Sequence, residues 1–512
     1  MRIKNSIKNI YIGIASQIII ILLGFISRKV FLDTLGAEYL GVNGLLTNVL
    51  SILGLVEAGI GTSIVYNIYK PLADKDESKI IALVQLYKKL YGILAIIIFI
   101  LSICIYPFMR ILINESESIT NLTLVYFIFV INNMITYINA HKWSLINADQ
   151  KGYVLAKYNL LFNIVTTITK IIILKSTGSY VLFLISELLI FIVKNLWNGK
   201  IVNKRYPYIK TKQKYIIENN IKDNITKNVK AIFIQNIGKQ CIYGTDNILI
   251  AMLIDVKTVG LYSNYSMITG QMWSLINIIL DGVSASVGNL IAIERQEKKY
   301  EIFNVIYLVN FWIYSFCTIT LFIILEPFIN WWIGSGMLLD KLTFTFILIN
   351  FYISGLRTSI SMFKEKAGIF DEDKYIRLIE AAVNLIASFI FAKIYGLAGI
   401  FMGTAFSSVT IALWVQSKLV YNKVFNKSVL EYFKKYAFYL ILTIIVGGIT
   451  KYTCLKLVNY SGFISILLKG MISLILVNGI YVIIFFKSKQ FKYLISIAKN
   501  IVSMKGKGRV LN

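Results

Sequence analysis

Apolar runs of about 20 residues recur along this chain from end to end, and they limit its possible folds more than any other feature. A helix of about 20 apolar residues matches the ~30 Å hydrocarbon thickness of a bilayer. Hydrophobic residues make up 57% of the chain and charged residues only 15%, and the mean hydropathy is +0.69. The sequence therefore predicts an all-α polytopic membrane protein rather than a soluble one.

We expect about 14 transmembrane helices in the 512 residues. Their approximate limits are 10–32, 41–68, 88–113, 119–141, 154–175, 180–201, 231–254, 259–291, 301–325, 341–363, 375–395, 397–420, 436–457 and 463–486. The first run follows Lys4 and Lys8 and so resembles a signal peptide, but it is too long and lacks a small-residue cleavage site. We interpret it as a retained first span.

Basic residues give the chain a formal net charge of +27. They gather between the predicted spans, at 70–79, 200–214 and 294–299, and in the tail from residue 487. Lys and Arg mark the cytoplasmic side of a membrane protein, and an even number of spans places both termini there. The charge therefore indicates orientation and attraction to anionic membrane lipids, and it gives no reason to expect a nucleic-acid partner.

Residues and loops suited to enzymatic chemistry are scarce. The four cysteines are far apart in apolar surroundings, and the single histidine, His141, lies near the end of a span, so neither suggests a metal or catalytic site. No P-loop motif is present. A polysaccharide polymerase or glycosyltransferase, the enzyme alternative, needs a large external loop, and the longest one expected covers only 326–340. We predict a protein that is not an enzyme.

Weak matches between the two halves recur at a nearly constant spacing. Gly41 in "LGVNGLL" and Gly260 in "VGLYSNY" are 219 residues apart, and "VNK" at 202–204 meets "YNK" at 421–423 with the same offset. Spans 1–6 and 7–12 therefore resemble two copies of one six-helix unit, inserted the same way up. We predict a V of two bundles around a cavity.

This repeat divides the chain into five parts. We expect an N-terminal six-helix bundle over 1–202, a basic cytoplasmic connection over 203–230 and a C-terminal six-helix bundle over 231–425. Two additional transmembrane helices over 426–490 and a basic tail over 491–512 lie outside the repeat.

Ionisable residues occur well inside several predicted spans, where each costs several kcal/mol unless it faces a protein interior or water. Any one of them could be a paired or snorkelling side chain, but the set indicates a hydrated central cavity. The cations are Arg28, Lys29, Lys170, Lys239 and Arg357, and the acids are Glu57, Glu187, Asp246, Asp281 and Glu380.

Two spans carry polar stripes. Lys239 and Asp246 are seven residues apart and so share a helix face, with Gln235 one turn earlier. The span over 41–68 carries amides, hydroxyls and an acid among its glycines, namely Asn43, Thr47, Asn48, Ser51 and Glu57. Glycines alone would be explained by close helix packing, but the acid and the amides would not. Asp281 occupies the corresponding position in the second half.

The stretch over 21–74, with its LGF…R segment, its L-G-x-x-x-x-G spacing and its acid beside glycine and serine, resembles the opening of polysaccharide flippases. These belong to the multidrug/oligosaccharidyl-lipid/polysaccharide exporter superfamily. The resemblance extends over the whole chain in topology but is strong in residue pattern only over the first two spans and "QKGYV" at 150–154. Arg28 matches a cationic position of the related lipid II flippases, whose denser span 1 arginines are missing here.

The resemblance implies translocation of polyprenyl-pyrophosphate-linked oligosaccharide repeat units across the bacterial cytoplasmic membrane, without ATP. The translocated units would enter capsule, exopolysaccharide or O-antigen assembly. A polysaccharide polymerase and glycosyltransferases would be further partners. A cation-coupled drug exporter of the same superfamily is the alternative, although it should have a cavity richer in acids than this one.

We expect four cations, Arg28, Lys170, Lys239 and Arg357, to bind the pyrophosphate or acidic sugars, because Arg and Lys pair with phosphate oxygens. Gln235 and Asn48 would bind sugar hydroxyls. Glu57, Asp246 and Asp281 would couple transport to H⁺ or Na⁺, since a poorly solvated carboxylate has a raised proton affinity. A static ion pair is the alternative role for Glu57. We expect no metal or organic cofactor.

Overall fold

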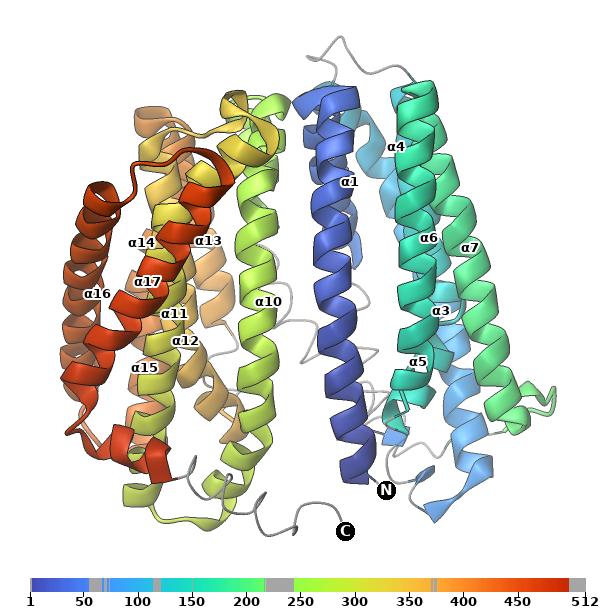
Figure 1. Cartoon of the computed structure of the whole chain (residues 1–512). Helices are drawn as coiled ribbons and strands as arrows, with labels where there is room; N and C mark the ends of the chain where they lie inside the picture. The colour runs from blue at the N-terminus through green and yellow to red at the C-terminus, as the bar shows by residue number, and fades with distance from the viewer. Residues whose placement is uncertain are drawn as a thin grey trace. The chain divides into compact units, whose positions relative to one another are not determined.

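The computed structural model describes residues 2–54, 67–68, 71–72, 74–113, 121–149, 151–215, 217, 244–369, 372 and 375–496. The regular elements among these residues are all helices. These residues contain no strand (Figure 1). Nine of their helices are long and apolar enough to cross a membrane, or ten if the pair α4 and α5, bent by 45°, counts as one span. The predicted all-α polytopic membrane fold is confirmed.

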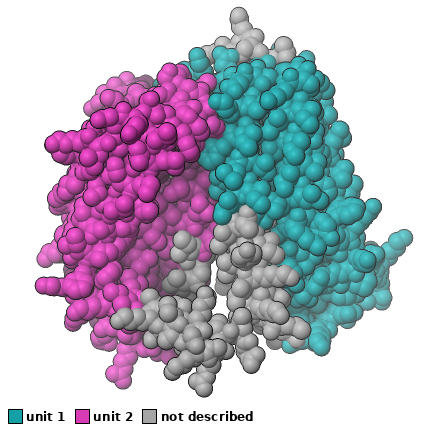
Figure 2. Space-filling view, viewed as in Figure 1, with its two compact units in different colours: residues 1–263 teal, residues 264–512 magenta. Residues whose placement is uncertain are grey.

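The chain divides into two compact units, unit 1 over Met1–Ser263 and unit 2 over Asn264–Asn512 (Figure 2). Unit 1 contains α1 (Arg2–Leu53), α3 (Glu77–Ile113), α4 (Leu122–Ile138), α5 (Ala140–Ala148), α6 (Tyr153–Thr177), α7 (Tyr180–Arg205), the 3₁₀ turn η2 (Pro207–Lys210), α9 (Asp246–Leu253) and the first turns of α10 (Val256–Ile293).

Unit 2 contains the rest of α10 and all the helices described after it. They are α11 (Gln296–Ile333), η3 (Ser335–Met337), α12 (Lys341–Lys366), α13 (Ile376–Tyr395), α14 (Leu397–Ser407), the π-helical η4 (Ser408–Leu413), α15 (Trp414–Val420), the π-helical η5 (Tyr421–Phe425), α16 (Leu430–Leu457) and α17 (Gly462–Phe485). The predicted limits of the spans from 341 onward agree with these helices to within a few residues at most ends. The start of α16 and the end of η5 differ by more.

The first helix corrects one prediction. We expected a connection between spans 10–32 and 41–68, but α1 is helical over all of Arg2–Leu53 except at Gly36. Gly36 has φ 84° and ψ −179°, a backbone conformation that side chains disfavour and glycine adopts freely. One glycine therefore separates the two helical halves of α1, and no longer loop is needed.

Helices α6 and α7 form an antiparallel hairpin close to the predicted spans 154–175 and 180–201. Gly178 ends α6 in the left-handed conformation, with φ 63°, and Ser179 caps α7 by accepting a hydrogen bond from the Leu182 amide at 3.3 Å. These are the usual glycine and serine signals for a helix end and a helix start. The hairpin brings residues at similar heights on the two helices side by side.

Two glycines allow α1 to touch the start of α10. A Cβ built on Gly41 would lie 1.9 Å from the carbonyl oxygen of Val256, and one built on Gly260 would lie 2.0 Å from that of Ala37. Backbone contact this close tolerates no side chain at either position. This packing explains why the compact units divide after Ser263, whereas the predicted bundles divide over 203–230. The predicted internal repeat and bundle limits stay predictions.

Candidate functional site

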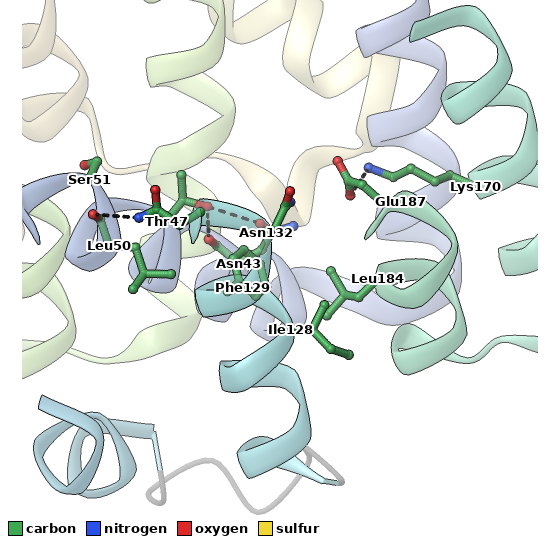
Figure 3. Close-up of a pocket in the computed structure, with 11 residues that line it drawn as sticks. Asn43, Thr47, Leu50, Ser51, Ile128, Phe129, Asn132, Lys170, Leu184 and Glu187 are labelled. Atoms are coloured by element: carbon green, nitrogen blue, oxygen red, sulfur yellow. Dashed lines mark hydrogen bonds and ion pairs between the residues drawn. The ribbon is translucent and has the colours of Figure 1, made fainter. Parts of the chain in front are cut away.

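A pocket of about 370 Å³ lies inside unit 1, among four helices (Figure 3). Its lining, which we call the Lys170 pocket, comes from α1, α4, α6 and α7. The residues are Asn43, Thr47, Leu50, Ser51, Ile128, Phe129, Asn132, Asn133, Lys170, Leu184 and Glu187. Amides, hydroxyls and one ion pair thus meet four apolar side chains within a bundle of apolar helices.

The second half of α1 supplies the hydroxyl side of the pocket. Asn43, Thr47 and Ser51 recur every four residues, so they lie on one face of the helix. The Thr47 hydroxyl donates to the Asn43 carbonyl at 2.7 Å, and the Ser51 hydroxyl donates to that of Asn48 at 2.8 Å. Bonds of this kind satisfy each hydroxyl hydrogen within the helix, and the Thr47 oxygen keeps lone pairs with which it can accept a hydrogen bond.

Helix α4 contributes two adjacent amides, Asn132 and Asn133. The Asn133 amide donates to the Leu50 carbonyl at 3.2 Å. Leu50 lies in the last turn of α1. This hydrogen bond ties the polar face of α1 to α4.

The charged side of the pocket is an ion pair across the α6–α7 hairpin. Lys170 Nζ lies 2.7 Å from Glu187 Oε2, and the ammonium also sits 4.2 Å from the centre of the Phe183 ring. The side chains retain 17% and 35% of their exposure, so both can be reached from the pocket. Such a pair can open and offer the ammonium to an incoming anion.

The other predicted site residues of unit 1 do not line this pocket. Arg28 Nη1 donates to the Ser263 hydroxyl at 2.8 Å and is half-buried. Asn48 is half-buried beside the α1 stripe. Asp246, the first residue of α9, is buried, and its Oδ1 has no hydrogen-bond partner among the residues that the structure describes. The roles predicted for these residues stay predictions.

Four predicted residues lie wholly or partly beyond what the structure describes. Gln235, Lys239 and Glu57 fall outside the described residues. Asp281 belongs to α10, but its side chain is outside the described part. Their roles in binding and coupling also stay predictions.

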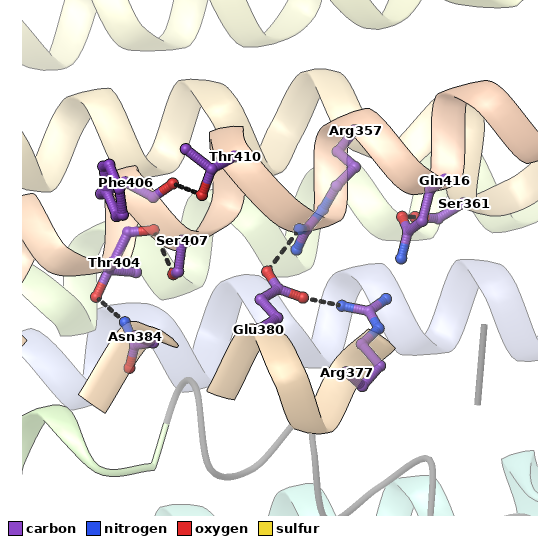
Figure 4. A network of polar contacts seen from close by, with 10 residues as sticks. All are labelled: Arg357, Ser361, Arg377, Glu380, Asn384, Thr404, Phe406, Ser407, Thr410 and Gln416. Carbon is purple, nitrogen blue, oxygen red and sulfur yellow. Dashed lines mark hydrogen bonds and ion pairs between the residues drawn. The ribbon is translucent and has the colours of Figure 1, made fainter. Parts of the chain in front are cut away.

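Unit 2 contains a second charged cluster, which is buried (Figure 4). Arg357 Nη1 on α12 lies 2.9 Å from Glu380 Oε1 on α13, and Arg377 Nη1 lies 3.5 Å from the other carboxylate oxygen. The side chains of Arg357 and Glu380 are 5% and 0% exposed. Arg357, predicted to bind substrate, is thus tied to a carboxylate in the interior of unit 2.

Further polar contacts extend this cluster along α12 and α15. The Ser361 hydroxyl, one turn after Arg357, donates to Gln416 Oε1 at 3.3 Å. On the other side, the Asn384 amide donates to the Thr404 hydroxyl at 3.0 Å (Figure 4). Arg357 is therefore one member of a polar network that joins α12, α13, α14 and α15.

Solved structures of membrane transporters match this arrangement of helices. The lipid II flippase MurJ, in an inward closed conformation, has a TM-score of 0.66 at 15% identity, over 93% of this chain and 99% of that one. A Vibrio cholerae MATE transporter has a TM-score of 0.56 at 11% identity, over 83% and 99%. An inward-facing multidrug resistance MATE transporter of the MOP superfamily has 0.54 at 14%, over 77% and 93%.

The chain has the fold of MurJ and the MATE transporters. No protein-family model matches the sequence, and no curated protein matches it either. The structural neighbours are transporters and flippases, and their fold agrees with the prediction of a multi-pass membrane protein. At these identities the likeness shows the fold, and the substrate has to be argued from the residues.

Sequence reasoning found part of the Lys170 pocket and missed the rest. It singled out Lys170 and Glu187 as charges inside spans and noted the polar stripe on α1. It did not select Asn132 or Asn133, because a neutral amide in a span gives a weaker signal than a charge. The hairpin could have indicated the ion pair, since Lys170 and Glu187 lie on the two predicted spans joined by the short connection at 175–179, each within about two helical turns of it.

Proposed function

We propose that the protein is a flippase that moves polyprenyl-pyrophosphate-linked oligosaccharide units across the bacterial cytoplasmic membrane, with both termini in the cytoplasm. The units would serve the assembly of a capsule, an exopolysaccharide or O-antigen. The observation that carries the proposal is the lining of the Lys170 pocket, which combines a cation with hydroxyls and amides inside a membrane-embedded bundle.

A lipid-linked sugar needs both kinds of group. Its pyrophosphate is an anion that apolar lipid excludes, and an ammonium donates strong charge-assisted hydrogen bonds to phosphate oxygens. Its sugars carry many hydroxyls, for which the Asn132 and Asn133 amides offer donors and acceptors and the Thr47 hydroxyl oxygen offers an acceptor. The apolar lining residues can pack against the faces of sugar rings.

The pair Lys170–Glu187 gives the pocket a release mechanism. Without substrate, Glu187 neutralises the ammonium at 2.7 Å. A bound phosphate competes with Glu187 for the same ammonium, so the exchange leaves no buried cation unpaired. Once the phosphate departs, the pair reforms, and the competition keeps substrate binding reversible.

The remaining predicted residues complete the proposal. Arg28, Asn48, Gln235 and Lys239 bind further parts of the head group, and Glu57, Asp246 and Asp281 couple the cycle to H⁺ or Na⁺. The polymerase and glycosyltransferases of the same assembly line are the protein partners. A drug exporter is the competing function because MATE transporters share the fold.

The test is transport by the purified protein in proteoliposomes loaded with a fluorescent polyprenyl-pyrophosphate oligosaccharide. Lys170→Gln should slow translocation by about 10- to 100-fold, because a charge-assisted hydrogen bond contributes about 1.5–3 kcal/mol. Lys175→Gln, which changes an exposed lysine on the same helix, is the matched control and should transport normally.

The same vesicles can be given a cationic fluorescent drug. Uptake of the drug, with no movement of the lipid-linked sugar, would establish the exporter function instead. Equal rates for wild type and Lys170→Gln with the lipid-linked sugar would remove the pocket from the proposal.

A further inference from the structure

The α6–α7 hairpin of unit 1 carries an exposed apolar face on each helix, and each face ends in lysine. We call Lys157 on α6 and Lys200 and Lys204 on α7 the hairpin lysines; all three are exposed. Spacings of three and four residues place them on the same helix faces as apolar side chains that are 42% to 59% exposed. These are Leu161, Val165, Ile168 and Ile172 on α6, and Leu189, Val193 and Leu196 on α7.

Both lysine-bearing ends lie at the same end of the hairpin. Helix α6 begins at Tyr153 and α7 ends at Arg205, and the two helices run antiparallel (Figure 1). The rings of Tyr158 and Trp197 meet there with their centres 6.5 Å apart, and Trp197 is 50% exposed. Trp and Tyr prefer the level of the lipid head groups. The rings therefore mark that level on the hairpin, directly beside Lys157.

The positive charge at this end is not balanced by carboxylates of the hairpin. Residues 150–217 contain a single acid, Glu187, which lines the Lys170 pocket. The acid just before them, Asp149, pairs with Lys151 at 2.6 Å. Among the residues that the structure describes, the hairpin lysines form no ion pair. Their ammonium groups are therefore available to an anion from outside the protein.

The basic segment that follows α7 is held against the helices of unit 1. The Tyr206 hydroxyl donates to Asp149 Oδ2 at 2.6 Å. The Gln85 amide of α3 donates to the Gln213 carbonyl at 2.7 Å, and its oxygen accepts from the Tyr215 amide at 3.2 Å. These bonds fix three further exposed lysines near the end of α7, namely Lys210, Lys212 and Lys214.

We propose that this end of the hairpin binds an anionic glycerophospholipid of the membrane. The acyl chains lie along the exposed apolar faces of α6 and α7, and the phosphate lies at Lys157, Lys200 and Lys204. Ammonium groups donate charge-assisted hydrogen bonds to phosphate oxygens, and clustered lysines beside a membrane span attract anionic lipids. A zwitterionic lipid offers the same chains but carries no net charge to balance the lysines. A soluble phosphate leaves the apolar faces uncovered.

The test is thermal unfolding of the purified protein in detergent, titrated with phosphatidylglycerol or with phosphatidylcholine of the same acyl chains. A ligand that binds only the folded state raises stability, so saturating phosphatidylglycerol should raise the unfolding midpoint by about 2–5 °C. Phosphatidylcholine should raise it less, and glycerol phosphate, which has the head group but no chains, should not raise it. Native mass spectrometry should show phosphatidylglycerol retained on the protein.

The decisive variant is Lys157→Gln/Lys200→Gln/Lys204→Gln, which changes exposed side chains and should fold normally. It should need about 10-fold more phosphatidylglycerol for half the shift, because each lysine near the head group adds to the attraction. The same three positions changed to Arg should behave like the wild type, since Arg also binds phosphate.

The matched control removes three exposed lysines of unit 2, as Lys418→Gln/Lys434→Gln/Lys487→Gln. Its phosphatidylglycerol shift should equal that of the wild type. A control that loses the shift as fully as the hairpin variant would overturn the proposal, because the lipid would then sense only total charge. Equal shifts with both lipids, an unchanged shift in the hairpin variant, or an equal shift with glycerol phosphate would overturn it too. None of these measurements involves transport, so this proposal and the flippase proposal can fail separately.

Discussion

Unit 1 and unit 2 each contain an ion pair between neighbouring membrane helices, but the two pairs differ in access. Lys170 and Glu187 line a pocket of about 370 Å³, and their side chains remain 17% and 35% exposed. Arg357 and Glu380 are 5% and 0% exposed, and Arg377 contacts the same carboxylate at 3.5 Å. The accessible pair can exchange partners, whereas the buried pair is fixed by its surroundings.

The difference shows that a charge inside a membrane span does not by itself identify a substrate site. Removing a charge from water is costly at both places, and each protein charge is compensated by another. Only the pair with an adjacent cavity can give up one partner to a ligand. The exposure of the paired side chains and the presence of a cavity beside them therefore distinguish the candidate transport site from the interior network. The presence of charge does not.

The largest effect should follow from breaking the buried pair. Glu380→Ala removes the carboxylate that Arg357 and Arg377 share, and losing one partner of a buried pair costs about 3–5 kcal/mol. We expect a sharp fall in the unfolding midpoint in detergent, or failure to purify a folded protein. Fluorescence-detected size-exclusion chromatography after a heating series measures the change.

The double variant Arg357→Met/Glu380→Leu is the control for that experiment. It replaces both charges by apolar groups of similar size and should recover most of the lost stability, since buried ion pairs can often be replaced in this way. A Glu380→Ala protein as stable as wild type would mean that water reaches the cluster, and the contrast between the units would then be wrong.

The sequence predicts the spans well because hydrophobic length alone determines them. The predicted 154–175 and 180–201 match α6 and α7, where Gly178 and Ser179 mark the helix ends. The sequence could not predict that the two halves of α1 join at Gly36. The positive φ of this glycine is a property of the backbone, and the hydropathy pattern does not report it. The extension of α4 into α5 likewise depends on a local break at Asn139.

The candidate site could be predicted only in its charged part. Lys170 and Glu187 stand out because charges are rare in spans, but the sequence gives no measure of how deeply each is buried. Arg357 gives the same signal as Lys170, and only packing shows that it lies in a closed interior. Contacts between distant helices, such as Arg28 with Ser263, depend on how the helices assemble and cannot be derived from periodicity.

A smaller effect on stability, with a clear effect on binding, should follow from changing the accessible pair. Glu187→Gln removes the competitor of the substrate phosphate, so Lys170 should hold a pyrophosphate-linked glycan several-fold more tightly and release it more slowly. Stability should change by less than about 1 kcal/mol, because a partly exposed pair contributes little. Equilibrium binding of the fluorescent substrate, compared with its translocation rate, measures both consequences.

Weaker binding by Glu187→Gln would contradict the exchange mechanism, because it would mean that the carboxylate itself contacts the ligand. Glu38→Gln is a suitable control, since it removes a carboxylate of α1 that is not part of the pocket lining. Its binding and translocation should match the wild type.

The smallest effect should come from a pair that is more exposed than either of these. Lys423 on η5 pairs with Glu372, in the connection between α12 and α13, and the side chains are 48% and 37% exposed. The hydrogen bond and charge of Lys423 lower the pKa of Glu372. Because the folded-state pKa is the lower one, the pair stabilises the protein above the ordinary pKa of glutamate, about 4.3, and this contribution is lost as the pH falls through the folded-state value.

Glu372→Gln removes that contribution and should lower the unfolding midpoint at pH 7 by less than Glu187→Gln does, because solvent and salt screen exposed charges. The difference from wild type should shrink as the pH falls below about 4 and should also shrink in 1 M salt. Unfolding midpoints of both proteins across pH 3–7, at low and high salt, measure it. A Glu372→Gln protein destabilised as much as Glu380→Ala would show that exposure does not govern the strength of these pairs, and the comparison between the two units would lose its physical basis.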